Sequence, residues 1–167
     1  ILLGITGSIA AYKAADIARR LKKEGCNIKV VMTKSSELFI TETTLESLSG
    51  NKVISEDHES TVVSNFKHLD LAKWADIILI SPCTANFMNK LANGHGDDLL
   101  STICLAFTKK ICIAPAMNPD MWNNKVTQSN LKKLAEAEMD VIGPSYGTHA
   151  CGDIGYGRMT NPEQIIE

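Results

Sequence analysis

The first candidate for chemistry in this sequence is a cysteine in a glycine-rich stretch near its end. Cys151 lies within "SYGTHACGDIGYGRM", residues 145–159, two positions after His149 and ahead of Arg158. Glycines at this density disfavour a helix or an ordinary core strand, so we expect a loop. Because loops rarely bury a thiol for packing alone, the pattern indicates a chemical role for Cys151.

A second candidate is Asn118 in "APAMNPDMW", where two prolines stiffen the turn. An asparagine held at a helix start can hydrogen-bond a carboxylate through its amide NH2 and the neighbouring N–H groups. Met117, Met121 and Trp122 would supply apolar cover. A packed loop with Asn118 in an Asx-turn is the alternative, but the unusual composition favours function.

Hydroxyl and glycine residues in "GITGSIAAYK" are typical of a phosphate site. Gly7 and Ser8 lie at the expected start of a helix, where free N–H groups and the positive end of the helix dipole attract anions. The stretch matches neither a P-loop nor GxGxxG, so a turn in which Ser8 only caps the helix remains open. Thr33 would add a hydroxyl to the same phosphate or to a ribityl chain, or it caps a helix.

The stretch "SPCTANFMNK" places Thr84, Ala85 and Asn86 at another helix start. Small and hydroxyl residues there permit the close approach of a flat ligand. Cys83 is interpreted as a small core residue, because nothing in the sequence activates its thiol. His95, between two glycines, is interpreted as an exposed loop residue and not as a metal ligand.

His68 in "FKHLDLAKWAD" starts a short expected helix. A lone histidine at such a position is usually a cap or a surface residue, and the local sequence does not decide between these roles and a functional one.

Five apolar runs predict the strands that position these residues: "ILLGIT", "IKVVMT", "DIILIS", "KICIAP" and "DVIGP". Helical spacing follows the first run, with Lys and Arg on the other face, in Ala10, Ala14, Ile17, Ala18 and Leu21. Further helices are expected over "SELFITETTLESLSG" with a break, over 86–92, over 99–107 and over "TQSNLKKLAEAE", and a short strand over "NKVI". This order implies an α/β fold with a three-layer, doubly wound parallel sheet, flavodoxin- or Rossmann-like.

Composition bounds the class of protein. The 167 residues, 44% hydrophobic and 22% charged, fit one domain over 1–167. A net charge of −2 argues against a protein built to grip nucleic acid or an anionic membrane, and no apolar run reaches the length of a membrane span. The five cysteines lack zinc-ligand spacing, so we expect no metal and reduced thiols in the cytoplasm. The absence of an initial methionine is compatible with one domain of a longer chain, and residues 55–67 are expected to be mobile.

The order of the motifs resembles that of the flavin-dependent cysteine decarboxylases, and in particular the phosphopantothenoylcysteine decarboxylases of coenzyme A biosynthesis. The resemblance rests on "GITGSIAAYK", "HLDLAKWAD", "SPCTAN", "PAMNPDMW" and "ACGDIGYGRM", and it covers nearly the whole chain. The PxMNxxMW pattern is complete, whereas "SPCTAN" has Thr84 where the family usually has serine. The amino-terminal half of bacterial bifunctional decarboxylase–ligases is the most similar branch, and a ligase domain after residue 167 is compatible with it.

The resemblance implies FMN as cofactor, a small-molecule substrate, and homo-oligomers that are trimers or dodecamers built from trimers. It implies FMN contacts by Gly7, Ser8, Thr33, Ser81, Thr84, Ala85, Asn86 and Ala116. It implies substrate contacts by Asn118, Met121, Thr148, His149 and Ala150, and catalytic roles for His68, Asn118 and Cys151.

The implied reaction converts 4'-phosphopantothenoylcysteine to 4'-phosphopantetheine. Oxidation of the CH2–SH carbon by FMN gives a thioaldehyde that accepts the electrons as CO2 leaves, which produces an enethiolate. Return of a hydride from the reduced flavin then requires an acid for the neighbouring carbon. A thiol is mostly protonated at pH 7, so Cys151, which the resemblance implies to be catalytic, is expected to be this acid. His68 suits by its type the role of a base that assists the thiol oxidation.

Three other activities share this fold. A flavin prenyltransferase typically carries Arg-Glu-Thr-Pro where this chain has "PAMNPDMW". A peptide-cysteine decarboxylase of lantibiotic maturation would share His68 and Asn118, but the "ACGDIGYGRM" segment favours the coenzyme A branch. A flavin-binding regulatory subunit typically has an acidic tail, which is not seen in these residues.

Overall fold

The structure is a computed structural model that describes residues 1–55 and 67–167. Its centre is a five-stranded parallel sheet of order β2-β1-β3-β4-β5. The strands are β1 (Leu2–Ile5), β2 (Lys29–Met32), β3 (Ile77–Cys83), β4 (Lys110–Pro115) and β5 (Asp140–Val141). The predicted doubly wound α/β fold is confirmed, and the last of the five predicted strands is short.

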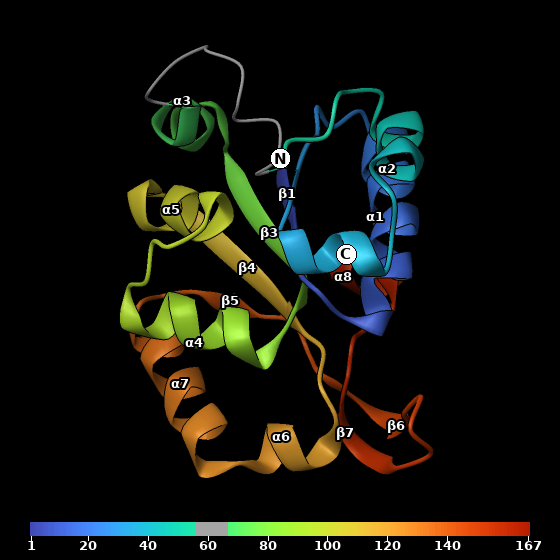
Figure 1. Cartoon of the computed structure of the whole chain (residues 1–167), viewed down its shortest axis with the longest axis vertical. Helices are drawn as coiled ribbons and strands as arrows, with labels where there is room; N and C mark the ends of the chain where they lie inside the picture. The colour runs from blue at the N-terminus through green and yellow to red at the C-terminus, as the bar shows by residue number, and fades with distance from the viewer. Residues whose placement is uncertain (56–66) are drawn as a thin grey trace.

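Helices cover both faces of the sheet and produce three layers (Figure 1). One face carries α1 (Tyr12–Lys23), α2 (Glu42–Ser49) and α8 (Pro162–Ile166). The other carries α3 (Lys67–Trp74), α4 (Ala85–Asn93), α5 (Leu99–Ala106) and α7 (Lys125–Glu136). Successive strand side chains point to opposite faces, so Leu2 packs in one core and Leu3 in the other. This double burial explains why the strands read as continuous apolar runs.

Three short helices start close behind strands and so lie near the carboxyl edge of the sheet. They are η1 (Ile9–Ala11) after β1, η2 (Lys34–Leu38) after β2 and α6 (Pro119–Asn123) after β4. The predicted break in "SELFITETTLESLSG" is the gap between η2 and α2. The expected strand over "NKVI" is reduced to one parallel bridge from Ile54 to Val31.

The glycine-rich segment is a β-hairpin, so the prediction of a loop was wrong for 145–148 and 154–158, whereas residues 149–153, which include Cys151, form the connecting loop. The antiparallel strands β6 (Ser145–Thr148) and β7 (Ile154–Arg158) form a separate two-stranded sheet. Glycine usually disfavours a strand, but here the missing side chains at Gly155 and Gly157 make room for neighbouring elements. The hairpin lies beside α6 at the lower end of the molecule in Figure 1.

The stretch 55–67, expected to be mobile, falls mostly outside the described residues. Its two ends are ordered: Ser55 is buried and Lys67 begins α3. In the part of the chain that the structure describes, no helix is long and apolar enough to cross a membrane.

Candidate active site at the carboxyl edge of the sheet

The candidate site lies at the carboxyl ends of β1 and β3. In a sheet of this strand order the chain leaves these neighbouring strands in opposite directions, which opens a crevice between them. Thr6, directly after β1, donates its hydroxyl hydrogen to the Pro82 carbonyl at 2.8 Å and accepts the Thr84 N–H at 3.1 Å. The buried hydroxyl ties the two strand ends together. Sequence reasoning missed Thr6, and its position right behind an apolar strand was the available signal.

The turns after β1 and β2 bring several hydroxyl groups to the same edge. A Cβ on Gly7 would lie 2.6 Å from Ser35 Oγ, so glycine is what lets the two turns meet. Ser8 Oγ accepts the Ala10 N–H at 3.2 Å and caps η1. Thr33 Oγ1 lies 3.2 Å from Ser35 Oγ. The capping alternative for Ser8 is therefore seen, and the contacts of Gly7, Ser8 and Thr33 with a cofactor stay predictions.

The third turn starts α4. Thr84 is its N-cap and accepts the Phe87 N–H through Oγ1 at 3.2 Å. Ala85 and Asn86 form the first helical turn, whose N–H groups have no partner within the helix. Asn86 is exposed. The turn therefore offers donors near Thr6 at the crevice, as a phosphate or a flat ligand would require.

Three of the predicted cofactor residues are buried, namely Thr33, Ser81 and Ala116. Ser81 is fully buried in β3 and donates its hydroxyl hydrogen to the sulfur of Met159 at 3.5 Å, so it supports the site from behind. Ala116 follows β4, and its N–H donates to the Cys83 carbonyl at 2.9 Å. Burial raises the pKa of the Cys83 thiol, in agreement with the predicted core role.

A cavity of about 510 Å³ opens between η1 and α1, the turn after β4 and the hairpin. The predicted site residues that line it are Ser8, Ala116, Asn118, Thr148, His149, Ala150 and Cys151. The predicted residues outside its described lining are Gly7, Thr33, His68, Ser81, Thr84, Ala85, Asn86 and Met121. The cavity thus joins the asparagine and the thiol, which lie 33 positions apart in the sequence (151 − 118).

The backbone fixes the orientation of the Asn118 amide. Asn118 is the N-cap of α6, and its Oδ1 accepts the Met121 N–H at 2.8 Å. A backbone N–H can only donate, so Oδ1 must face the helix and the NH2 group is left for another acceptor. The helix cap and a role in ligand binding are therefore compatible. The cap uses the side-chain oxygen of Asn118, and both amide hydrogens remain available beside the cavity.

Cys151 stands at the exposed tip of the hairpin. Its Sγ donates to Asp153 Oδ2 at 3.2 Å. The tip is held by the His149 N–H, which donates to the Asp153 carbonyl at 2.8 Å, and by the Gly152 N–H, which donates to the His149 carbonyl at 3.0 Å. His149 Nε2 lies 3.2 Å from the Gly155 carbonyl, and that contact requires the hydrogen on Nε2.

Glycines bring the hairpin against α6. A Cβ on Gly157 would lie 2.4 Å from the Met117 carbonyl oxygen, and one on Gly155 would lie 2.8 Å from Pro119 Cβ. The two glycines are two positions apart and therefore share one face of β7. The Met117 N–H also donates to the Gly157 carbonyl at 2.9 Å. The glycine spacing thus sets Cys151 across the cavity from Asn118.

Lys13 and Arg158 are cavity residues that the sequence analysis did not propose as ligands. Helical spacing predicted that the lysines of α1 lie on its outer face. That prediction is wrong for Lys13, which is buried. Its Nζ donates to the Met159 carbonyl at 2.8 Å and to Asn161 Oδ1 at 3.2 Å. Burial lowers the pKa of Lys13, and the nearby charge of Arg158 lowers it further. The ammonium thereby anchors the chain that leaves the hairpin to α1.

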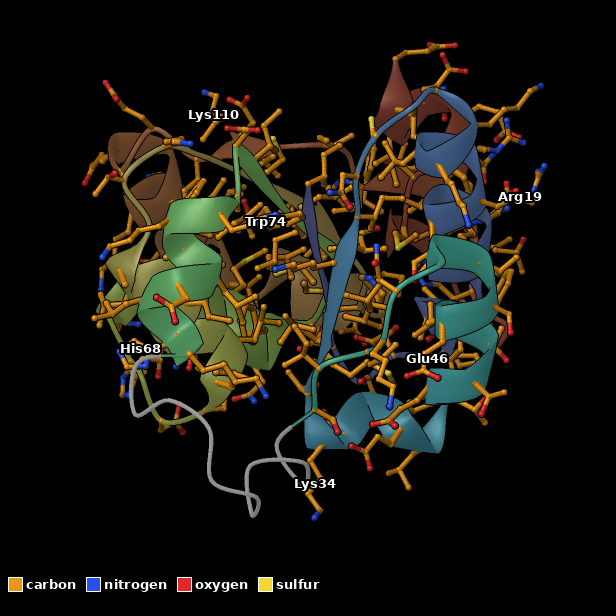
Figure 2. All side chains as sticks on the ribbon, turned by 90° about the horizontal axis from the view of Figure 1, so that it is seen from above. Arg19, Lys34, Glu46, His68, Trp74 and Lys110 are labelled. Atoms are coloured by element: carbon orange, nitrogen blue, oxygen red, sulfur yellow. The ribbon has the colours of Figure 1, made fainter. Side chains whose placement is uncertain are left out.

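His68 lies away from this cavity within one copy of the chain. It is the second residue of α3, which stands at the upper end of the molecule in Figure 1, opposite to α6 and the hairpin. Figure 2 shows His68 on the layer opposite to the one that carries Arg19 and Glu46. Met121 is half exposed on α6, outside the cavity lining. The predicted roles of His68 and Met121 therefore require something besides this cavity.

A second cavity of about 440 Å³ lies between α4, α5 and the end of α7. His95 and Cys104 are part of its wall, together with Lys90, whose ammonium is paired with Asp97 and Asp98. Across the described ranges, 1–55 and 67–167, no cluster of three His, Cys, Asp or Glu side chains could hold a metal ion.

Comparison with known proteins agrees with this geometry. The chain matches the Flavoprotein family over residues 1–167. It is 45% identical over 166 residues to the coenzyme A biosynthesis bifunctional protein CoaBC of Vibrio vulnificus strain YJ016, which covers 99% of this chain and 41% of that protein. The chain therefore spans about two fifths of the length of the curated relatives it matches.

Two solved structures are similar over nearly their whole length. A mutant of PPC decarboxylase complexed with pantothenoylaminoethenethiol has a TM-score of 0.86 and 35% identity, over 98% of this chain and 92% of that chain. The FMN-dependent cysteine decarboxylase SpaF has a TM-score of 0.84 and 27% identity, over 99% of this chain and 91% of that chain. The fold, the crevice and these similarities agree, and the chain belongs to the Flavoprotein family.

Proposed function

We propose that this chain is a carboxy-lyase that decarboxylates 4'-phosphopantothenoylcysteine to 4'-phosphopantetheine with FMN, a step of coenzyme A biosynthesis. The observation that carries the proposal is the cavity that sets the free amide hydrogens of Asn118 across from the thiol of Cys151. The similarity to PPC decarboxylase, whose named ligand pantothenoylaminoethenethiol is an enethiol, supports the same chemistry.

The carboxyl edge of the sheet fits FMN. Three turns converge there, with the hydroxyls of Ser8, Thr33 and Ser35 and the start of α4 at Thr84. Free N–H groups at a helix start and hydroxyl donors suit a phosphate and a ribityl chain. The close contact of Gly7 with Ser35 keeps this edge compact. FMN, when bound, supplies the two-electron oxidation and reduction that the cysteine carboxylate needs to lose CO2.

Asn118 would hold the substrate carboxylate through its NH2 group. Its oxygen is committed to capping α6, so the amide presents hydrogens and no competing acceptor. A neutral amide orients the carboxylate without a full counter-charge. A strong ion pair would stabilise the ground-state carboxylate more than the transition state, in which the negative charge moves away from the carboxylate into the rest of the substrate and CO2 departs neutral.

Cys151 would protonate the carbon that loses CO2. Its thiol lies on the cavity wall and its Sγ–H points to Asp153, which orients the group at the hairpin tip. The hairpin then contributes a proton donor and one wall of the cavity, and this wall restricts the access of water to the reacting carbon.

The site would be completed by a second copy of the chain, in a trimer or a multiple of one. His68 lies on α3, at the end of the molecule away from Asn118 and Cys151 (Figure 1). Ile9, Tyr12, Leu38 and Phe39 are exposed apolar side chains on η1 and η2 and at their ends, beside the strand ends. A subunit contact there would bury these side chains and let His68 of one copy approach the cavity of another.

The relatives named CoaBC are about two and a half times as long as this chain, from the 41% of their length that it covers. We propose that the chain is the decarboxylase domain of such a bifunctional protein, with a ligase domain following it. The five cysteines are all free thiols, which supports a reducing, cytoplasmic setting.

The test is incubation of the purified, FMN-loaded protein with 4'-phosphopantothenoylcysteine, with CO2 and 4'-phosphopantetheine measured together. Equal amounts of the two products support the proposal. Decarboxylation of a peptide with a carboxyl-terminal cysteine, without activity on the pantothenoyl substrate, would replace it with the peptide-cysteine decarboxylase. A protein that binds FMN and releases no CO2 from either substrate would be a non-catalytic flavin-binding subunit.

A further inference from the structure

Two cations line the cavity, and the proposed roles of Asn118 and Cys151 leave both unused. Lys13 and Arg158 are part of its wall, and the described lining residues include no Asp or Glu. A wall that carries positive charge and no acid favours an anion over a neutral ligand. The carboxylate of the proposed substrate already has a partner in Asn118, so a second anionic group is the natural occupant.

The hairpin holds Arg158 in a defined place. Arg158 pairs with Ser145 at the base of β6 and β7. A Cβ on Gly147 would lie 3.0 Å from Arg158 Nη1 and 3.3 Å from its Cδ, so the side chain lies across the glycine. Among the described residues, none forms a hydrogen bond or an ion pair with the Arg158 guanidinium. Its forked donors therefore remain available to a ligand.

Lys13 adds a charge behind Arg158. Its ammonium is bonded to the Met159 carbonyl and to Asn161 Oδ1, which leaves one of its three N–H donors. The carboxylate of Glu163, which favours the charged form of Lys13, is already paired with Arg20. Lys13 and Arg158 thus repel each other across the wall, and an anion between them would relieve that repulsion.

We propose that Arg158, backed by Lys13, binds the 4'-phosphate of the substrate and makes the enzyme select phosphorylated over unphosphorylated pantothenoylcysteine. This inference rests on the proposed function. A phosphomonoester carries between one and two negative charges near neutral pH, and a guanidinium fork binds such a group with two parallel hydrogen bonds. The cavity of about 510 Å³ has room for an extended ligand between Arg158 and Cys151.

The phosphate of FMN is the other source of the same chemistry. The turns at Gly7, Ser8 and Thr84 already offer donors for the FMN phosphate at the strand ends. Arg158 on the hairpin therefore remains available for the phosphate of the substrate. The two sources are separated by measuring flavin content and substrate preference in the same variants.

The experiment compares kcat/KM for 4'-phosphopantothenoylcysteine and for pantothenoylcysteine in the wild type, Arg158→Gln and Arg158→Lys. The wild type should prefer the phosphorylated substrate. Arg158→Gln should reduce that preference by about 10- to 100-fold, the usual worth of a charge-assisted pair, chiefly through KM. Arg158→Lys keeps the charge but loses the fork, so it should retain an intermediate preference. Arg19→Gln is the matched control, because Arg19 is exposed on α1, bonded to Asp16, and outside the cavity lining.

Each contrary outcome is distinct. A wild type without preference, or an Arg158→Gln variant that keeps the full preference, would overturn the inference and leave the decarboxylase function standing. Loss of bound FMN in Arg158→Gln, with an unchanged preference in the molecules that retain it, would assign the cation to the cofactor instead. A wild type inactive on both substrates would overturn the proposed function itself. If Arg158→Gln fails to fold, inhibition of the wild type decides: 4'-phosphopantetheine should compete at least tenfold better than pantetheine, and equal inhibition would contradict the inference.

Discussion

At the scale of the residue, Asn118 combines a structural bond with a chemical one. Its oxygen caps α6, and its NH2 group remains available on a residue that lines the cavity, so the two roles use different atoms. Because aspartate is as good an N-cap as asparagine, Asn118→Asp should keep the helix cap while it replaces the NH2 group. The chemical role can therefore be removed while the structural one stays.

Asn118→Asp should retain FMN and fold normally but lower kcat/KM for decarboxylation by about 100-fold or more. The new carboxylate would face the carboxylate of the substrate, and like charges about 4 Å apart repel by several kcal/mol in a protein site. Steady-state CO2 release and the flavin spectrum measure the two effects. Asp120→Asn, an exposed position of the same helix, is the control for a change of charge. Unchanged turnover in Asn118→Asp would reduce Asn118 to a helix cap.

Cys151→Ser should separate the two halves of the reaction. A serine hydroxyl is a far weaker acid than a thiol, so CO2 should be released about once per site while the enethiolate waits for a proton. Mass spectrometry should then find a compound two hydrogens lighter than 4'-phosphopantetheine. Cys26→Ser, at a half-buried cysteine remote from the cavity lining, serves as the control. Formation of 4'-phosphopantetheine at the wild-type rate would exclude Cys151 from the chemistry.

At the scale of the element, the hairpin and the turn at Thr6 hold the site together. The hairpin depends on Gly155 and Gly157, whose missing side chains admit Pro119 and the Met117 carbonyl. Thr6 bridges β1 and β3 through one hydroxyl. The two glycines and the Thr6 hydroxyl can each be tested by a substitution that leaves Asn118 and Cys151 unchanged.

Gly157→Ala should displace the hairpin while the parallel sheet stays intact. The added Cβ would meet a backbone oxygen at 2.4 Å, and the φ of +125° is unfavourable for any residue other than glycine. We expect kcat to fall by at least tenfold, because Cys151 would lose its position, and cleavage of the hairpin by trypsin at Arg158 to become faster. Gly25 also has a positive φ, of +82°, but its Cβ would meet open space, so Gly25→Ala is the control for backbone strain without a steric clash. Equal losses in the two variants would contradict the role of close packing.

Thr6→Val should weaken the junction of β1 and β3. Valine has nearly the same shape but leaves the part-buried Thr84 N–H and the buried Pro82 carbonyl without the Thr6 hydroxyl, which costs about 1–3 kcal/mol of unfolding free energy. Urea denaturation measures the loss, and FMN titration should show weaker binding at the same edge. Thr43→Val on the exposed side of α2 is the control. A variant as stable as the wild type would show that water replaces the hydroxyl.

The sequence was sufficient for the central strands and insufficient for the hairpin, for a physical reason. Strands β1 to β4 are buried on both faces, so their apolar runs report their position directly. Nothing local favours a strand at Gly155 or Gly157, because what stabilises it is the fit against Pro119. Lys13 was misplaced for the same reason: helical spacing treats a lysine as solvated, whereas the Met159 carbonyl and Asn161 provide a buried partner for its ammonium.

At the scale of the whole molecule, one copy of the chain holds Asn118 and Cys151 on one cavity, whereas α3, which carries His68, stands at the opposite end from α6 and the hairpin (Figure 1). Proteins that each carry one of two defects should therefore complement each other when their subunits are mixed. Inactive His68→Asn and inactive Asn118→Asp, dissociated and reassociated together, should recover up to about a quarter of the activity, as random assortment predicts. Activity measured with and without mixing, and light scattering for the size of the assembly, check this. No recovery, or a fully active monomer, would contradict a shared site.

The five thiols of the chain differ sharply in their access to solvent. Cys83 and Cys104 are buried, and burial raises the pKa of both, that of Cys104 to about 12. Cys26 and Cys112 are half-buried, whereas Cys151 is exposed at the hairpin tip. An electrophile such as iodoacetamide attacks the thiolate and needs room to approach, so Cys151 should be alkylated first. The geometry that offers a proton donor to the substrate thereby also offers a selective handle for irreversible inhibitors.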